Sequence, residues 1–387
     1  MTPYAVATAR GARRWRAGHP WIFRSDVERA PDAGAGAVLV RDTRGRELGW
    51  ALWSPPSEIS LRRIDPDPSA VIDASWWRHR LGAAIARRAD VARHANAFRL
   101  VHAEGDALPA LVVDRYDRWL VVQLLSAAVE TFRDMIVAAL QDLTGCAGIL
   151  ARNDAAIRTR EGLPRVVETL AGEVPDDVVV EEHGVRFHAA PHTGQKTGAF
   201  LDQRENRVLA GAHARGRALD LFSYHGSFAL HLARGADEVV AVDSSALALE
   251  RGAANASLNG LENIGFVEAD AFEFLRDQRA GSRYDTIVVD PPAFARNRAS
   301  LPGAIRGYRD LNLHAMRLLA PRGVLFTASC SYHVSKAAFL DMLRDAAAES
   351  GRTMVLRALT GQPADHPELL TVPETGYLKG ALLEALD

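Results

Sequence analysis

Carboxylates and one thiol follow the apolar runs in the C-terminal half of the sequence. Asp220, Asp243, Asp270 and Asp290 lie at or near the ends of four runs, and Cys330 follows a fifth. Such runs are typical of strands buried on both faces of a parallel sheet. Because ligands bind outside the carboxyl ends of parallel strands, we expect these five side chains to share one rim. One Asp there often only caps the next helix, but four beside a cysteine indicate a site.

The order of the acids indicates the ligand. Asp243, at the end of the second run, is placed to accept hydrogen bonds from two ribose hydroxyls, and we expect it to have no structural partner. The first turn, "DLFSYHGSF", lacks the G-x-G-x-x-G spacing that suits a pyrophosphate, and only Gly226 has an obvious backbone role. A nucleoside without phosphates fits better, with Asp270 near its base. S-adenosylmethionine meets this requirement, because its sulfonium suits a rim rich in carboxylates.

Cys330 has two interpretations. Free cysteine is among the most buried residue types, which favours simple packing. At a strand end, however, its thiol could instead be a nucleophile. Cys146 has no polar neighbours in the sequence that resemble a site, and it is expected to pack in a core. The two cysteines are too far apart in sequence for a metal-ligand motif, and the histidines show no zincin-like spacing, so we expect no metal.

The elements that must position these residues begin near residue 190. Strand, turn and helix patterns alternate from there to the C-terminus, which predicts an α/β fold with a doubly wound parallel sheet. At 387 residues the chain exceeds one typical core, so we expect further domains. Residues 1–70 have the alternation of a small β-rich unit. The proline-bearing segment 65–73 predicts a boundary, and 73–185 combines two hairpins with helical patterns, one turning at Asp114–Asp117 and the other at His183-Gly184.

Composition sets limits on location and partners. The sequence is 48% hydrophobic and 24% charged, with no stretch long and apolar enough to span a membrane. We therefore expect a cytoplasmic protein with reduced thiols. Residues 1–30 carry six arginines against two acids, with Trp15, Trp21 and Phe23 between them. Arginine interleaved with aromatic residues indicates a nucleic-acid surface, and a solvated basic face is about equally compatible with it.

Lysine is rare. Of 46 basic residues only Lys196, Lys336 and Lys379 are lysines. A position that keeps lysine against this bias indicates a need for a compact ammonium rather than a planar guanidinium.

The sequence as a whole resembles the bacterial 23S ribosomal RNA cytosine-5 methyltransferase family. The matching stretches are "GHPWIFRSDV", "HTGQKTGAFLDQRENR", "DLFSYHGSFALH", "VDSSALALERGAANASLNG", "VVDPPAFARN", "GYRDLNLHAMRLL", "SCSYH", "ADHP" and "YLKG". The resemblance implies a PUA-type RNA-binding domain at 1–70, a linking α/β domain at 73–185 and a Rossmann-like class I methyltransferase domain at 186–387. It also implies S-adenosylmethionine as cofactor and 23S ribosomal RNA as partner, and it leaves a homodimer open.

By this resemblance, Cys330 is the nucleophile that adds to carbon 6 of cytosine, and Asp290 acts near the ring. The expected cofactor contacts are Lys196, Thr197, Gly198, Arg204, Asp220, Phe222, Ser223, Gly226, Asp243, Asp270 and Asp290. The expected RNA contacts are Pro291, Pro292, Phe294, Arg13, Arg14 and Trp21. Lys196–Gly198 would form a lid over the cofactor, and Arg204 would reach its carboxylate.

The sequence departs from the expected pattern at two places. His225 and Ser227 stand where the first turn usually has Thr and Gly. Ala293 and Phe294 leave no second cysteine after the prolines of "DPPAF". This motif also suits exocyclic N-methylation of guanine or adenine with a structural Cys330. A non-catalytic RNA-binding assembly factor is a third hypothesis.

Overall fold

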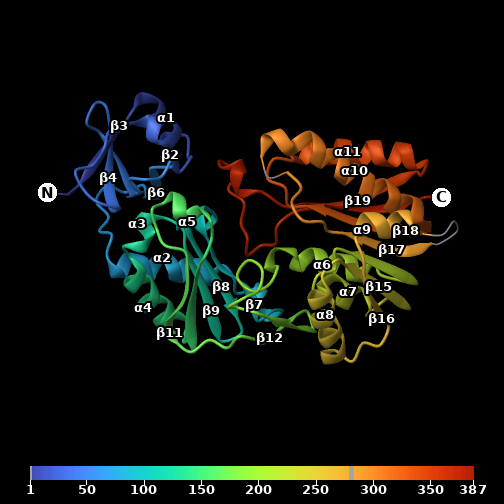
Figure 1. The fold of residues 1–387 in the computed structure, drawn as a ribbon. Coiled ribbons are helices and arrows are strands. Elements are labelled where there is room, and N and C mark those ends of the chain that lie inside the picture. Colours follow the sequence, from blue (N-terminus) through green and yellow to red (C-terminus); the bar gives the residue numbers. More distant parts are fainter. Residues whose placement is uncertain (1, 279–282, 296) are drawn as a thin grey trace. The chain divides into compact units, whose positions relative to one another are not determined.

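The computed structural model describes residues 2–278, 283–295 and 297–387. It divides into two compact units (Figure 1). The first unit contains Met1–Val180, Ala189–Leu201 and Ala364–Thr375. The second contains Glu181–His188, Asp202–Pro363 and Gly376–Asp387.

The first unit begins with a six-stranded sheet in the order β2-β6-β5-β4-β1-β3. Its elements are β1 (Tyr4–Ala7), α1 (Ala9–Arg16), β2 (Trp21–Ile22), β3 (Val27–Arg29), β4 (Gly36–Asp42), β5 (Glu47–Trp53) and β6 (Leu61–Asp65). The hydroxyl of Thr8 accepts a hydrogen bond from the Gly11 amide and caps α1. The β-rich pattern of the first 70 residues is therefore confirmed.

Trp15 belongs to the core of this sheet. Its side chain is 3% exposed, and its indole nitrogen donates to the carbonyl oxygen of Leu48 over 2.9 Å. Its assignment to a nucleic-acid surface is wrong, because the helical period of α1 turns Trp15 inward while its arginines point outward.

The middle part of the first unit is a five-stranded sheet in the order β11-β10-β9-β8-β7. Its elements are α2 (Ala74–Ala86), β7 (Ala97–His102), β8 (Leu111–Tyr116), β9 (Trp119–Leu124), α3 (Ala127–Glu130), α4 (Arg133–Thr144), β10 (Gly148–Asn153), α5 (Ile157–Arg160) and β11 (Val166–Gly172). Trp77 and Leu81 of α2 share a buried cluster with Ile136 and Leu140 of α4.

The β8–β9 hairpin differs from the sequence prediction. Its turn lies at Asp117 and Arg118, where Asp117 has a positive φ of 55°. Asp114 and Tyr116 remain within β8 and are fully buried. The predicted turn was placed too early because a polar residue within an apolar run suggested that the strand ended there. A second hairpin, β12 (Val178–Glu182) and β13 (Val185–Ala189), turns at His183 and Gly184 as predicted.

The second unit contains a seven-stranded sheet in the order β16-β15-β14-β17-β18-β20-β19. Its elements are α6 (Arg204–Ala212), β14 (Arg217–Leu221), α7 (Ser227–Leu232), β15 (Glu238–Asp243), α8 (Ala246–Leu258), β16 (Ile264–Glu268), α9 (Ala271–Arg276), β17 (Tyr284–Val289), α10 (Leu301–Leu318), β18 (Leu319–Ser329), α11 (Lys336–Ser350), β19 (Met354–Thr360) and β20 (Lys379–Ala385). Strands β14 to β18 pair in parallel, and β20 lies antiparallel to both β18 and β19.

Helices cover both faces of this sheet. One face carries α9, α10 and α11, and the other carries α6, α7 and α8 (Figure 1). The strand order reverses between β14 and β17, which start crossovers in opposite directions. A reversal of this kind opens a crevice at the carboxyl ends of the strands. The predicted doubly wound sheet is confirmed.

The domain expected at 186–387 is not continuous, because two of its segments make their contacts with the first unit. Ala189–Leu201 and Ala364–Thr375 belong to the first unit. The physical reason is hydrogen bonding to the middle sheet. The Arg99 amide donates to Asp365 over 2.8 Å, and Thr197 donates to Asp114 over 2.6 Å.

Candidate active site

Cys330 and Asp290 follow neighbouring parallel strands. Val289 of β17 is paired with Thr327 of β18, so Asp290 leaves the sheet beside the last residues of β18, and Cys330 follows directly. The Cys330 side chain is partly buried against the core under β18. The predicted juxtaposition of acid and thiol at the carboxyl edge is therefore present in the strand order.

The loops that carry these residues are tied together by Ser331. Its hydroxyl accepts a hydrogen bond from the Ala295 amide over 3.2 Å and lies 2.9 Å from the Tyr308 hydroxyl. Ser331 and Tyr308 are both fully buried. Burial raises the pKa of Tyr308, so its hydroxyl keeps its proton at neutral pH. This neutral network fixes the "DPPAF" loop against the "SCSYH" loop.

Gln203 holds the carboxylate of Asp290. Its Nε2 donates to Asp290 Oδ1 over 2.8 Å, while its Oε1 accepts from Asn206 over 2.6 Å. Gln203 is 4% exposed. The sequence alone does not indicate this role, although Gln203 lies next to Arg204 in the stretch "HTGQKTGAFLDQRENR" that matches the family.

The first strand-to-helix turn has an unusual backbone. Phe222, Tyr224 and Gly226 have positive φ angles of 63°, 50° and 74°. Non-glycine residues rarely adopt this region, and such angles concentrate at ligand sites. The Ser223 amide donates to the carbonyl oxygen of Val242 over 3.0 Å, which holds the turn against β15.

Two buried polar atoms of this turn have no hydrogen-bond partner among the described residues. They are Oδ1 of Asp220 and Oγ of Ser223. A buried polar group without a partner is costly, and it is often satisfied by a ligand or water. These two atoms, beside the carboxylate of Asp243, fit the hydroxyl and amino groups of a bound S-adenosylmethionine.

Asp220 is more enclosed than we expected from the sequence. It is 1% exposed, and its Oδ2 accepts from the Ala229 amide over 2.9 Å, which anchors the start of α7. Burial raises the pKa of Asp220 well above its usual value, and the nearby charges of Asp290 and Asp243 raise it further. The prediction of four open carboxylates on the rim is corrected at this position, because Asp220 lies within β14 rather than after it.

Asp243 is half-buried at the end of β15, and its two oxygens have structural partners. Oδ2 accepts from the Tyr224 amide over 2.9 Å, and Oδ1 accepts from the Ser245 amide over 3.0 Å. The expectation that Asp243 has no structural partner is wrong. Each carboxylate oxygen has a second lone pair, so the acid can still accept from ribose hydroxyls.

Asp270 is the N-cap of α9. Its Oδ1 accepts from the amides of Phe272 and Glu273 over 2.9 and 3.1 Å, and its side chain is exposed. Phe294 of the "DPPAF" loop packs near Phe272 and Tyr308, with ring centroids 6.0 and 4.7 Å apart. Within the same loop, Pro291 is buried and Pro292 is exposed.

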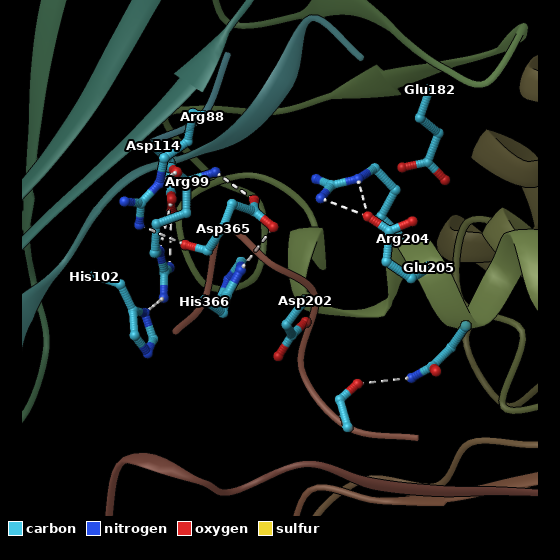
Figure 2. A network of polar contacts seen from close by, with 12 residues as sticks. Arg88, Arg99, His102, Asp114, Glu182, Asp202, Arg204, Glu205, Asp365 and His366 are labelled. Carbon is cyan, nitrogen blue, oxygen red and sulfur yellow. Dashed lines mark hydrogen bonds and ion pairs between the residues drawn. The ribbon is translucent and has the colours of Figure 1, made fainter. Parts of the chain in front are cut away.

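Arg204 is enclosed rather than extended. It is 1% exposed, and its Nε and Nη2 donate to Glu205 over 3.2 and 3.0 Å (Figure 2). Its expected reach to a cofactor carboxylate is not supported by this arrangement, because the neighbouring carboxylate already takes the guanidinium.

Thr197 and Gly198 are buried in the first unit, and Lys196 is exposed there. The Thr197 hydroxyl donates to Asp114 and lies 3.0 Å from the Tyr116 hydroxyl. Asp114 also accepts two hydrogen bonds from Arg99 (Figure 2). The predicted lid segment is thus fixed to the middle sheet by Asp114, which lies in β8 rather than in the turn that the sequence predicts.

The predicted RNA contacts at the N-terminus have different environments. Arg13 is exposed on α1. Arg14 lies 3.4 Å from Asp26 and over the Phe23 ring. The Trp21 indole donates to Glu104 over 2.9 Å. Arg13 is therefore the best placed of these three for a phosphate.

Two features are absent from the described residues. No cluster of three or more His, Cys, Asp or Glu side chains could hold a metal ion there. No helix in the same part of the chain is both long and apolar enough to cross a membrane.

The strand order with its antiparallel β20, and the acids and thiol at the carboxyl edge, define a class I S-adenosylmethionine-dependent methyltransferase. A family model described as S-adenosylmethionine-dependent methyltransferase matches residues 98–382, and a PUA-like domain model matches residues 8–66. The cofactor of this protein is S-adenosylmethionine.

Curated relatives narrow the family. A protein of Tolumonas auensis named ribosomal RNA large subunit methyltransferase I is 42% identical, over 95% of this chain and 96% of the relative. One of the same name from Aeromonas salmonicida is 40% identical, over 95% of each chain. The chain belongs to the family of these ribosomal RNA large subunit methyltransferase I proteins.

Solved structures share the fold. An S-adenosylmethionine-dependent methyltransferase from Streptococcus mutans is 21% identical with a TM-score of 0.82, over 98% of this chain and 99% of that chain. A methyltransferase solved with SAH is 22% identical with a TM-score of 0.83, over the same shares.

Proposed function

We propose that this protein transfers a methyl group from S-adenosylmethionine to carbon 5 of a cytosine in 23S ribosomal RNA. The observation that carries the proposal is the placement of Cys330 after β18 beside Asp290 after β17. The names of the relatives support ribosomal RNA of the large subunit as substrate. The PUA-like match supports an RNA contact by the N-terminal sheet, and a cytoplasmic location follows from this substrate.

Carbon 5 of cytosine is a poor nucleophile, so the chemistry needs a covalent step. The Cys330 thiolate adds to carbon 6, and the electrons of the ring double bond make carbon 5 an enamine carbon that can attack. S-adenosylmethionine supplies the activated methyl group when it is bound. A base then takes the carbon 5 proton, and the electrons of that bond restore the double bond between carbons 5 and 6 and expel the thiolate.

Asp290 has the second role in this proposal. In this proposal its carboxyl group is protonated when the base binds and donates its O–H to ring nitrogen 3, which offsets the negative charge that develops on the ring during addition. Gln203 restricts the rotation of this carboxylate through the 2.8 Å hydrogen bond. The target base must leave its stack to reach Cys330, and Phe294 and Pro292 are proposed to contact it.

The test uses an RNA that contains 5-fluorocytosine at the target. Fluorine cannot leave as the proton does, so a covalent protein–RNA adduct accumulates and is seen as a band of higher mass under denaturing conditions. Cys330→Ala is expected to form no adduct and to lose methyl transfer, while S-adenosylmethionine binding by calorimetry stays within about twofold. Cys146→Ala, in the first unit, is the matched control and is expected to form the adduct normally.

Two outcomes would contradict the proposal. Methyl transfer by Cys330→Ala, with the methyl group found on an exocyclic nitrogen of guanine or adenine, would assign the "DPPAF" loop to N-methylation. Absence of S-adenosylmethionine binding by the unaltered protein would favour an assembly factor.

A further inference from the structure

Lys379 is a buried lysine beside the loop that carries Cys330. It begins β20 and is paired across the sheet with Ser329, the residue before Cys330. Its side chain is 4% exposed. Its Nζ donates to the carbonyl oxygens of Ser331 and Tyr377, each over 2.7 Å. The amine is therefore held in one place at the carboxyl end of β18.

The charge of this lysine acts on the thiol. Two carbonyl oxygens accept two of the three hydrogen bonds that an ammonium can donate, and carbonyls carry no full charge to balance it. Burial lowers the pKa of Lys379 to about 8, the positive charge of Lys336 adds to that effect, and the Cys330 thiolate opposes it. A buried ammonium is costly unless it is paired with an anion.

We propose that Lys379 is the positioning residue that keeps Cys330 as a thiolate, a role that rests on the function proposed above. The proton leaves Sγ and is accepted by the neutral amine of Lys379, which gives a thiolate and an ammonium with no other reactant. A cysteine beside a lysine titrates below its usual range because the cation stabilises the anion. The same ammonium stabilises the thiolate again when it is expelled from carbon 6.

Lys379 is proposed to matter most in the step in which the Cys330 thiolate is expelled from carbon 6. The "DPPAF" loop offers no second thiol that could assist release, because Ala293 and Phe294 follow its prolines. An ammonium beside the leaving sulfur makes the thiolate a better leaving group without a second thiol. Lysine suits the role because its ammonium is a compact point charge on a flexible stem, and Lys379 keeps this residue type in a chain that otherwise favours arginine.

Other titratable groups near this pair must be separated from Lys379. Tyr308 of α10 interacts with Cys330, Lys336 at the start of α11 interacts with Lys379, and Asp290 follows the neighbouring strand β17. Tyr308 is neutral at physiological pH, since burial raises its pKa. Lys336 is exposed, so solvent screens its charge, which makes it a matched control of the same residue type.

The experiment measures the pH dependence of Cys330 alkylation by iodoacetamide in a Cys146→Ala background, where Cys330 is the sole cysteine. We expect a midpoint well below the usual cysteine pKa of about 8.5. Lys379→Met should raise the midpoint by at least about one unit, which slows alkylation at pH 7 about tenfold. Lys379→Arg should restore most of the low midpoint, and Lys336→Met should shift it by less than about 0.3 units.

The outcomes separate this inference from the proposed function. An unchanged midpoint in Lys379→Met, with S-adenosylmethionine binding intact, overturns the role of Lys379 even if Cys330→Ala is inactive. Full activity of Cys330→Ala overturns the proposed function, and a low midpoint would then still show the effect of Lys379 on the thiol. If Lys379→Met fails to fold, the alkylation midpoint of the Cys146→Ala protein tests the inference by itself. A midpoint at or above about 8.5 contradicts the inference.

Discussion

Gln203 donates a hydrogen bond to Asp290 across the methyltransferase sheet's carboxyl edge, from the residue that precedes α6 to the residue that follows β17. A second hydrogen bond, from Asn206, fixes the Gln203 amide itself. The chain Asn206–Gln203–Asp290 thus orients the carboxylate that we propose to act on the cytosine ring. Gln203 and Asp290 are 87 residues apart in the sequence, so the fold brings them together.

Replacement of Gln203 by Leu is expected to lower kcat about 10- to 100-fold with little change in cofactor affinity. The reason is that a hydrogen bond to a charged group contributes about 1.5–3 kcal/mol, and Asp290 would rotate without it. Steady-state methyl transfer and calorimetric binding of S-adenosylmethionine measure the two effects. Gln141→Leu, an exposed change on α4, is the control, and equal kinetics in both variants would remove Gln203 from the site.

Asp243→Ala is expected to reduce both cofactor affinity and the stability of the apo protein. Its two oxygens accept amide hydrogen bonds from Tyr224 and Ser245, so the variant leaves two amides without their partner. We expect a loss of about 1–3 kcal/mol in the free energy of unfolding. Asp243→Asn retains one carbonyl acceptor. Its free energy of unfolding, measured by chemical denaturation, should lie between those of Asp243→Ala and the unaltered protein. Undiminished cofactor affinity in Asp243→Ala would leave Asp243 with a purely structural role.

The sequence predicted the sheet and most of its carboxyl edge, because alternating strand and helix patterns and strand-end acids are local features. It did not predict the partners of those residues. Asp114 was interpreted as part of a turn, yet it is buried in β8 and binds Thr197. Lys379 stands out in the sequence only as one of three lysines, and Gln203 only as part of a stretch that matches the family. Their roles arise from contacts between strands and loops far apart in the chain. Burial of Asp220 and Arg204 is likewise decided by packing, which composition does not reveal.

His102 is expected to make the first unit less stable at acidic pH. Burial lowers its pKa to about 2, with further lowering by the charges of Arg99, His366 and Arg88 (Figure 2). The folded state therefore keeps His102 neutral, whereas the unfolded chain binds a proton below about pH 6.5. Stability that is present above pH 6.5 is lost as the pH falls, by up to about 1.4 kcal/mol per unit.

Chemical denaturation of the full chain at pH 7 and pH 5 measures this effect. His102→Asn, which keeps a hydrogen-bond acceptor for Arg99, should lose about 2 kcal/mol less than the unaltered protein over this interval. His94→Asn, a change at the exposed position just after the 3-10 helix Val91–Arg93, is the control and should keep the full pH dependence. Identical pH dependence in all three proteins would mean that His102 is not protonated on unfolding as described.

Arg13 is expected to contribute to RNA affinity through a phosphate. It is exposed on α1, whereas Arg10 and Arg14 are paired with Asp26 and Arg16 is paired with Asp42. A cation that neutralises one phosphate of a single strand adds about 0.7 to the slope of log affinity against log salt concentration. Arg13→Ala should therefore weaken binding to a ribosomal RNA fragment at low salt and reduce that slope by about 0.7. Fluorescence anisotropy across a salt series measures both quantities, with Arg344→Ala, an exposed change on α11, as the charge-matched control. S-adenosylmethionine affinity should stay the same in both variants, and equal slopes for Arg13→Ala and Arg344→Ala would identify the arginines of α1 as a solvated basic face.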